Sequence, residues 1–255
     1  MKSYDFTKQP SILIQGAMET ETEYLIGQLE GTDCVTLGNW KFYTGLLGKN
    51  KEPVIVSRTY QGMVNAAAAT ALALTHFAPR VVINQGIGGG HSKEFHVGDI
   101  VLGERVIPMG ARMWGFSEEG AGIDEKDFKI LKIEIYSKLE GCTKKVSVFP
   151  CDERLLAIAE KVKTNCHTGR GTLGSADEWN NQLDRIALLG ERYQTAVEDM
   201  ESAATAQLCL SYNVPFIGIR ILSNSIVNGE VFDESKGLAG QKYIIKYVEA
   251  LCGFA

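Results

Sequence analysis

Residues 80–90 read RVVINQGIGGG, an apolar run that passes directly into glycines. The run Arg80–Asn84 is rich in β-branched residues and shows no polar alternation, which is typical of a parallel strand covered on both faces. Gly86–Gly90 then permits two interpretations: a loop that needs positive φ angles, or a backbone that approaches a planar ligand closely. The spacing is not G-x-G-x-x-G, and no helix with an acidic residue about 20 positions on follows, so we exclude a Rossmann dinucleotide site.

Strand and helix signals alternate on both sides of this stretch. The expected strands are Ser11–Gln15, Phe42–Leu47, Pro53–Ser57, Val97–Leu102, Arg170–Gly174 and Val214–Ile221. The expected helices are a segment from Glu19, then Gln61–Phe77, Asp152–Lys163, Asn181–Gly190, Glu201–Tyr212 and Gly240–Leu251, with a loop at Gly110–Gly122. This alternation predicts a largely parallel sheet in a three-layer α/β domain. With no repeat, low-complexity tract or linker visible, we expect residues 1–255 to form a single domain.

The charge and composition of the chain argue against nucleic acid and membranes as its partners. The 255 residues carry 26 Lys and Arg against 31 Asp and Glu, a net charge of −5, which offers no general attraction to nucleic acid or to an anionic membrane. The start, MKSYDFTKQP, lacks the apolar region of a secretory signal, and Gly62–Pro79 is alanine-rich, as in a buried helix rather than a membrane span. Six cysteines lack metal-site spacing. We therefore expect a cytoplasmic protein with no metal or cofactor and a small-molecule ligand.

Two acidic clusters follow predicted strands and are candidates for chemistry. Gly16–Glu23 reads GAMETETE and places three carboxylates around a helix start, where the helix dipole favours anions. A solvated first turn and a functional carboxylate are both consistent with that pattern. Glu198–Glu201 reads EDME before an alanine-rich helix, and a carboxylate there could instead hold a diol through two charge-assisted hydrogen bonds.

Several motifs together resemble the methylthioadenosine/S-adenosylhomocysteine nucleosidases of the nucleoside phosphorylase superfamily. They are GAMETE at 16–21, FYTG at 42–45, INQGIGGG at 83–90, VGDIV at 97–101, SADEWN at 175–180, EDMESAATAQLC at 198–209, VPFIGIRILSNS at 214–225 and FDE at 232–234. The resemblance implies a three-layer αβα sandwich around a central mixed, partly barrel-like sheet. It also implies a homodimer that hydrolyses the N-glycosidic bond of a purine nucleoside and releases the free base.

The same resemblance implies a role for individual residues. Glu21 matches the carboxylate that activates the attacking water, while Met200 and Glu201 match the pair at the ribose. Trp179 falls where the family stacks an aromatic ring on the base, and Asn180 follows it. The remaining substrate contacts implied are Met18, Gly88, Gly89, Ser223 and Phe232, and Arg220 is expected to hold the loop that follows its strand.

Asn224 departs from the family pattern, in which this position is an Asp that protonates adenine. A carboxamide cannot serve as a general acid, but its NH2 and C=O groups suit a 6-oxopurine. The preference for adenine is therefore open. A nearby acid such as Asp177, Glu178 or Asp199 could replace the missing Asp.

Phosphorolysis is a separate question. The phosphate-binding arginines of bacterial phosphorylases have no counterpart at the matching positions, although Arg58 and Arg112 could approach from elsewhere. Water is thus the expected nucleophile. The alternatives are a nucleosidase or phosphorylase acting on inosine or guanosine, and a nucleoside-binding protein without catalysis. His91 and His96 are expected to be exposed loop histidines.

Overall fold

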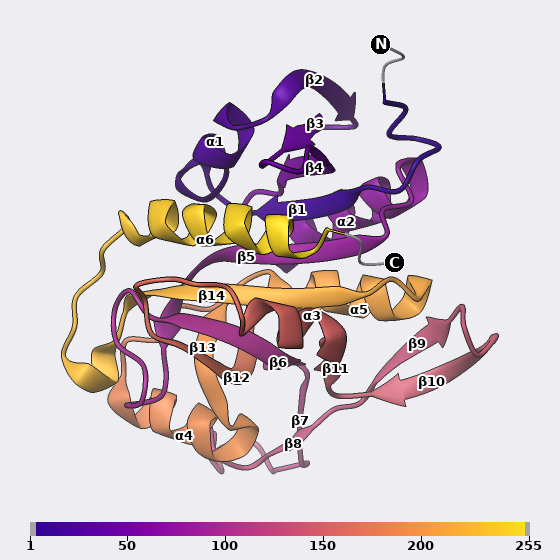
Figure 1. Ribbon diagram of the computed structural model, residues 1–255. Coiled ribbons are helices and arrows are strands. Elements are labelled where there is room, and N and C mark those ends of the chain that lie inside the picture. Colours follow the sequence, from indigo (N-terminus) through magenta and orange to yellow (C-terminus); the bar gives the residue numbers. More distant parts are fainter. Residues whose placement is uncertain (1–3, 253–255) are drawn as a thin grey trace.

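The computed structural model describes residues 4–252. Their main element is one ten-stranded mixed sheet (Figure 1). Its central strand, β5 (Val81–Gly90), pairs in parallel with β1 (Ile12–Gly16) and β14 (Phe216–Asn224) and antiparallel with β13 (Thr195–Asp199). The N-terminal part continues from β1 through the strands β4 (Glu52–Arg58), β3 (Trp40–Leu47) and β2 (Glu30–Leu37).

The other side of the sheet closes on itself. β13 pairs with β12 (Thr168–Ser175), β12 with β6 (Ile100–Pro108), and β6 with β14, which returns to β5. These five strands form a closed circuit, and β11 (Phe149–Pro150) pairs with β6 at Arg105 and Val106, beyond the residues of β6 that pair with β14. The α/β class with a central mixed, partly barrel-like sheet is confirmed, whereas the largely parallel sheet expected from the alternation alone is wrong.

Helices cover the sheet on two sides. α1 (Glu19–Gly27), α3 (Glu153–Ala159) and α6 (Lys236–Ala250) pack on one side, and α2 (Met63–His76) and α5 (Ser202–Tyr212) on the other (Figure 1). The strands between them carry the apolar core, in which Ile12–Ile14, Val54–Val56 and Val81–Ile83 are fully buried. Burial on both faces explains why these strands lack polar alternation.

The remaining elements lie at the periphery. They are the helix α4 (Leu183–Tyr193), the short 3-10 helix η1 (Ile226–Asn228) and two antiparallel strand pairs. One pair is β7 (Arg112–Trp114) with β8 (Phe128–Ile130), and the other is β9 (Ile133–Ser137) with β10 (Cys142–Val146). The six cysteines are free thiols. Among residues 4–252, no helix is both long and apolar enough to cross a bilayer.

Some sequence-based boundaries need correction. The glycines Gly86–Gly90 belong to strand β5, and none of them has a positive φ, so the loop interpretation is wrong. The strand expected at Val97–Leu102 begins only at Ile100, because Gly98 adopts a φ of 97° in a turn before it. The sequence reading missed β2 and β13, since β2 is mostly exposed on both faces and β13 is only five residues long.

Candidate active site

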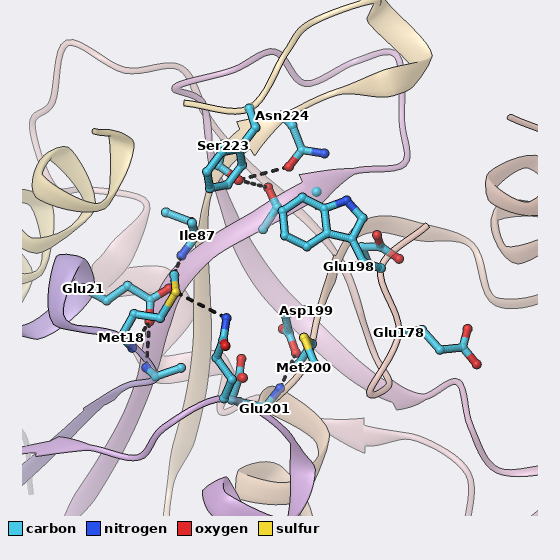
Figure 2. Close-up of a pocket in the computed structure, with 16 residues that line it drawn as sticks. Met18, Glu21, Ile87, Glu178, Glu198, Asp199, Met200, Glu201, Ser223 and Asn224 are labelled. Carbon is cyan, nitrogen blue, oxygen red and sulfur yellow. Dashed lines mark hydrogen bonds between the residues drawn. The ribbon is translucent and has the colours of Figure 1, made fainter. Parts of the chain in front are cut away.

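One pocket lies where β1, β5, β13 and β14 end, as expected for a sheet of this type (Figure 2). All the predicted site residues except Asn180 line it. The full lining consists of Ala17, Met18, Glu21, Gln61, Ile87, Gly88, Gly89, Glu178, Trp179, Glu198, Asp199, Met200, Glu201, Ser223, Asn224 and Phe232. The fold thus brings together segments that lie more than 200 residues apart in the sequence.

Glu21 is the one carboxylate of the Gly16–Glu23 cluster that turns into the pocket. Its Oε2 accepts hydrogen bonds from the backbone N–H groups of Ala17 (2.6 Å) and Met18 (3.0 Å), and its Oε1 accepts one from Ile87 (2.8 Å). Gly86 makes room for it, since a Cβ there would lie 2.4 Å from Oε1. Burial raises the pKa of Glu21 despite these hydrogen bonds. A fixed carboxylate with a raised pKa is suited to take a proton.

The neighbouring carboxylates of that cluster have a structural role. Glu19 and Glu23 are exposed and pair with the Arg58 guanidinium at 3.2 and 3.0 Å. Arg58 also donates to the Thr22 hydroxyl. The solvated-turn interpretation therefore applies to Glu19 and Glu23 but not to Glu21.

Glu201 forms a second buried carboxylate at the start of α5. Its Oε1 accepts a hydrogen bond from the Gly62 backbone at 2.9 Å. Burial, together with the negative charges of Asp199 and Glu21, raises the pKa of Glu201 to about 7, while Arg220 opposes the shift. Met200 precedes it on the pocket wall (Figure 2). Glu201 thus presents its carboxyl to the pocket next to an apolar surface.

Asp199 and Arg220 form a buried ion pair behind that wall. The Nε of Arg220 lies 3.1 Å from Oδ2 of Asp199, and both side chains are about 1% exposed. Asp199 Oδ1 also accepts from the backbone N–H groups of Glu201 (3.0 Å) and Ser202 (2.9 Å). Arg220 was expected to hold the loop after its strand, but its hydrogen bonds go to Asn84 and to its own strand. The Asp199 carboxylate is thus already engaged by an arginine and by two backbone N–H groups.

The opposite end of the pocket carries Ser223 and Asn224 at the end of β14. The Ser223 hydroxyl lies 3.1 Å from Asn224 Oδ1 and 3.2 Å from the Gly88 carbonyl, and it can donate to either. The ring of Trp179 lies 5.5 Å from that of Phe232, and both side chains are about half exposed at the mouth. This end combines aromatic surface with a few polar groups.

Glu198 is a pocket residue to which the sequence analysis assigned no role apart from its membership of the acidic cluster Glu198–Glu201. Its Oε1 accepts from the Asn180 backbone at 2.9 Å and its Oε2 from the Asn180 carboxamide at 2.5 Å, so Asn180 supports Glu198 instead of lining the pocket. His91 Nε2 lies 3.1 Å from Oε2. His91 was expected to be exposed but is buried, with Nδ1 2.8 Å from the Thr195 hydroxyl. His96 is exposed as expected and contacts Glu230.

No Lys or Arg lines the pocket within residues 4–252. Arg112 donates to the Met109 carbonyl, and its nearest carboxylate is Glu178 at 3.8 Å. Glu178 lines the pocket but pairs with Arg185 at 3.1 Å, and Asp177 accepts from the Met63 backbone at the start of α2. The same part of the chain contains no group of three or more His, Cys, Asp or Glu placed to hold a metal ion.

Comparisons with known proteins show the family of this chain. The model of the Phosphorylase superfamily matches residues 11–245. The 5′-methylthioadenosine/S-adenosylhomocysteine nucleosidases of Bacillus cereus (strain G9842) and Bacillus thuringiensis (strain Al Hakam) are each 31% identical over 250 residues, which is 94% of this chain and 99% of theirs.

Solved structures share the fold. The 5′-methylthioadenosine/S-adenosylhomocysteine nucleosidase from Neisseria meningitidis, in complex with methylthio-immucillin-A, has a TM-score of 0.77 at 24% identity and covers 95% of this chain and 100% of its own. The futalosine hydrolase of Helicobacter pylori strain 26695 has a TM-score of 0.76 at 20% identity and covers 94% and 97%.

Proposed function

Because this chain belongs to the phosphorylase superfamily and, within it, to the 5′-methylthioadenosine/S-adenosylhomocysteine nucleosidases, we propose that it hydrolyses the N-glycosidic bond of a purine nucleoside. The observation that carries the proposal is a pocket whose buried carboxylates include Glu21 and Glu201 and which no Lys or Arg among residues 4–252 lines. The products are the free base and the sugar.

Glu21 is the general base of this reaction. Water forms a bond to C1′ of the ribose and gives its proton to Glu21, while the electron pair of the C1′–N9 bond passes into the purine. The purine takes up one proton, so that the elements of one water molecule are added overall. Three backbone N–H groups fix the Glu21 carboxylate, and this preorganisation removes the cost of orienting it during the reaction.

Glu201 binds the ribose through its two vicinal hydroxyls. An ionised carboxylate accepts two charge-assisted hydrogen bonds from such a diol. Met200 supplies the apolar surface beneath the sugar, and Met18 lies on the Glu21 side, where we place the 5′ substituent (Figure 2).

Trp179 and Phe232 enclose the base and the mouth of the pocket. An indole ring offers a large stacking surface for a purine. Gly88 and Gly89 leave the backbone of β5 open along the nucleoside, and Ser223 with Asn224 faces the edge of the base. The groups on that edge of the base, which differ between adenine and the 6-oxopurines, decide which base the pocket binds.

Water, not phosphate, is the nucleophile in this proposal. A phosphate dianion needs several charge-assisted donors, and the Glu21 carboxylate would repel it. Arg58 and Arg112, the two arginines considered from the sequence, are engaged by other groups outside the pocket.

Chromatography of the released base tests the reaction. The panel consists of adenosine, inosine and guanosine and of the 5′-methylthio derivatives of adenosine and inosine, each with and without phosphate. We expect free base at a rate independent of phosphate. A rate proportional to phosphate, with ribose 1-phosphate as product, would replace hydrolysis by phosphorolysis, and the absence of any base would favour a nucleoside-binding protein.

The Glu21→Gln variant tests the assigned base. Loss of a general base lowers kcat by about 10²- to 10⁴-fold, while the affinity for free base, measured by calorimetry, stays within about threefold since Glu21 lies at the sugar. Glu134→Gln, a substitution of an exposed glutamate on β9, is the matched control. Full turnover by Glu21→Gln would remove this residue from the mechanism.

For the assembly we propose a cytoplasmic homodimer of single-domain subunits. The support is an exposed group of large apolar side chains in the segment 113–123, namely Met113, Trp114, Phe116 and Ile123, which a second subunit would cover. Light scattering after size-exclusion chromatography tests it, and a monomeric mass at micromolar concentration would refute the dimer.

A further inference from the structure

Two polar side chains of opposite hydrogen-bonding character share the base end of the pocket. Glu198 belongs to β13 and Asn224 to β14, and both lie away from Glu21 and Met18 (Figure 2). They also lie close to each other. A Cβ placed on Gly89 would be 3.4 Å both from Glu198 Oε1 and from Asn224 Nδ2.

Glu198 is held as an acceptor with one position to spare. Its carboxylate accepts two hydrogen bonds, from the Asn180 N–H and the Asn180 carboxamide, and His91 Nε2 lies 3.1 Å from Oε2. A carboxylate has about four lone-pair positions. At least one of these positions remains for an N–H of a ligand, and the two hydrogen bonds from Asn180 fix the orientation of the carboxylate.

Asn224 is held as a donor. The Ser223 hydroxyl can give its proton only to an acceptor, and Asn224 Oδ1 lies 3.1 Å from it. Oδ1 therefore has a donor within reach, which it shares with the Gly88 carbonyl, whereas Nδ2 has no hydrogen-bond partner among residues 4–252. The carboxamide therefore offers its NH2 group to the pocket.

The donor of Asn224 and the acceptor of Glu198 match the edge of a 6-oxopurine better than the same edge of a 6-aminopurine. A 6-oxopurine presents an N1–H donor next to its O6 acceptor. A 6-aminopurine presents an N1 acceptor next to an N–H donor. We propose that Glu198 accepts from N1–H and Asn224 donates to O6, so that this pocket selects a 6-oxopurine nucleoside. This inference rests on the proposed hydrolysis and adds the class of base.

The same pair explains how the base can leave without a general acid. When the C1′–N9 bond breaks, its electron pair spreads over the purine, and in a 6-oxopurine part of the charge reaches O6. A donor placed at O6 stabilises that charge as it develops. Asn224 can do this through Nδ2, although it has no proton to transfer, and the base then takes its proton from water.

Competition between matched substrates tests the selection. We compare 5′-methylthioinosine with 5′-methylthioadenosine, and inosine with 1-methylinosine, which lacks the N1–H. A buried donor or acceptor left without a partner costs about 1–3 kcal/mol, so we expect kcat/KM to favour the 6-oxo member by at least about tenfold and 1-methylinosine to be cleaved at least about tenfold more slowly than inosine.

Two variants assign the effect to the pair. Glu198→Gln replaces the carboxylate by a group of the same shape and should lower kcat/KM for inosine by about 10- to 100-fold, with little change for adenosine. Asn224→Asp removes the NH2 donor and should shift preference toward the 6-amino substrate. Glu134→Gln serves again as the control. A Glu198→Gln variant with unchanged discrimination would overturn the role of Glu198.

Binding of the free bases separates this inference from the proposed reaction. Calorimetry with the unmodified protein should give tighter binding of hypoxanthine than of adenine. Preference for adenine in both binding and cleavage overturns the base selection and leaves the hydrolysis intact. Failure to release base from any nucleoside overturns the hydrolysis, while tighter binding of hypoxanthine would still support the selection.

Discussion

At the scale of single residues, the buried carboxyl of Glu201 must ionise for the proposed function, and burial opposes that ionisation. Its pKa is raised from 4.5 to about 7, chiefly by burial. Only the ionised form accepts both hydroxyls of a ribose, so the proposed function needs the form that the folded protein disfavours. We expect kcat/KM to fall about tenfold per pH unit below pH 7, and initial rates in buffers from pH 5 to 9 measure this. A flat profile would show that an ionised Glu201 is not required.

The same raised pKa predicts a stability effect of the opposite sign. The folded protein holds the proton of Glu201 more tightly than the unfolded chain does, so this group's stabilising contribution is complete below pH 4.5 and is lost as the pH rises through 7. Glu201→Gln cannot ionise, yet its amide oxygen can still accept from Gly62. At pH 8 it should raise the free energy of unfolding by roughly 2–3 kcal/mol.

Urea unfolding at pH 8 and pH 5 measures that gain. It should shrink at pH 5, and Glu134→Gln, on the exposed hairpin strand β9, should show no gain at either pH. Equal stability of Glu201→Gln and the unmodified protein at pH 8 would contradict the raised pKa.

Residues of the site differ in how far the sequence could predict them. Glu21 and Glu201 stand in motifs, GAMETE and EDMES, whose resemblance to a family implied their positions. Glu198 was missed because its partners, His91 and Asn180, are distant in sequence. A histidine next to a glycine run looks like an exposed loop residue until the strand β13 is known to pass beside it.

At the scale of elements, the glycines of the central strand β5 belong both to the sheet and to the pocket wall. Gly88 and Gly89 are neighbours with different surroundings. A Cβ on Gly88 would lie 2.6 Å from Val197 and 2.9 Å from the Glu198 carbonyl, both in β13. A Cβ on Gly89 would meet only side chains of the pocket, at 3.3 Å or more.

These surroundings predict different outcomes for two alanine substitutions. Gly88→Ala should push β13 away and lower the free energy of unfolding by about 1–3 kcal/mol. Gly89→Ala should change stability by less than about 0.5 kcal/mol but weaken binding of the base, because its methyl group enters the pocket between Glu198 and Asn224. Thermal melting and calorimetry on both variants measure the contrast, and equal loss of stability would refute it.

Elements with strong apolar runs were predicted well, and those without were not. β1, β4, β5 and β14 are buried on both faces, so their composition revealed them. The strands β2 and β10 have mostly exposed residues, and β9 alternates between exposed and buried positions, so none of the three contains a continuous apolar run. The antiparallel pairing of β13 with β5 depends on contacts between distant segments, which no local pattern encodes.

At the scale of the whole molecule, the closed circuit of strands carries a buried charge pair between β13 and β14. Asp199 and Arg220 are almost completely buried, and Asp199 also holds the backbone of Glu201. Removing one partner leaves a charge without compensation in the core, which costs about 3–5 kcal/mol. The pair thus links closure of the barrel to the position of Glu201, the carboxylate that we propose to bind the ribose.

A double-mutant cycle tests that link across the molecule. Arg220→Met and Asp199→Asn should each lower the free energy of unfolding by about 3–5 kcal/mol. The double variant should lose clearly less than the sum, because neither charge is left alone. Both variants that lack the Asp199 carboxylate should bind nucleoside more weakly, since a neutral carboxamide oxygen is a weaker acceptor for the backbone N–H of Glu201 than a carboxylate oxygen. Urea unfolding and nucleoside calorimetry are measured on the unmodified protein, the two single variants and the double variant. If the losses in free energy of unfolding are additive and the nucleoside affinity is unchanged, the ion pair neither couples β13 to β14 nor positions Glu201.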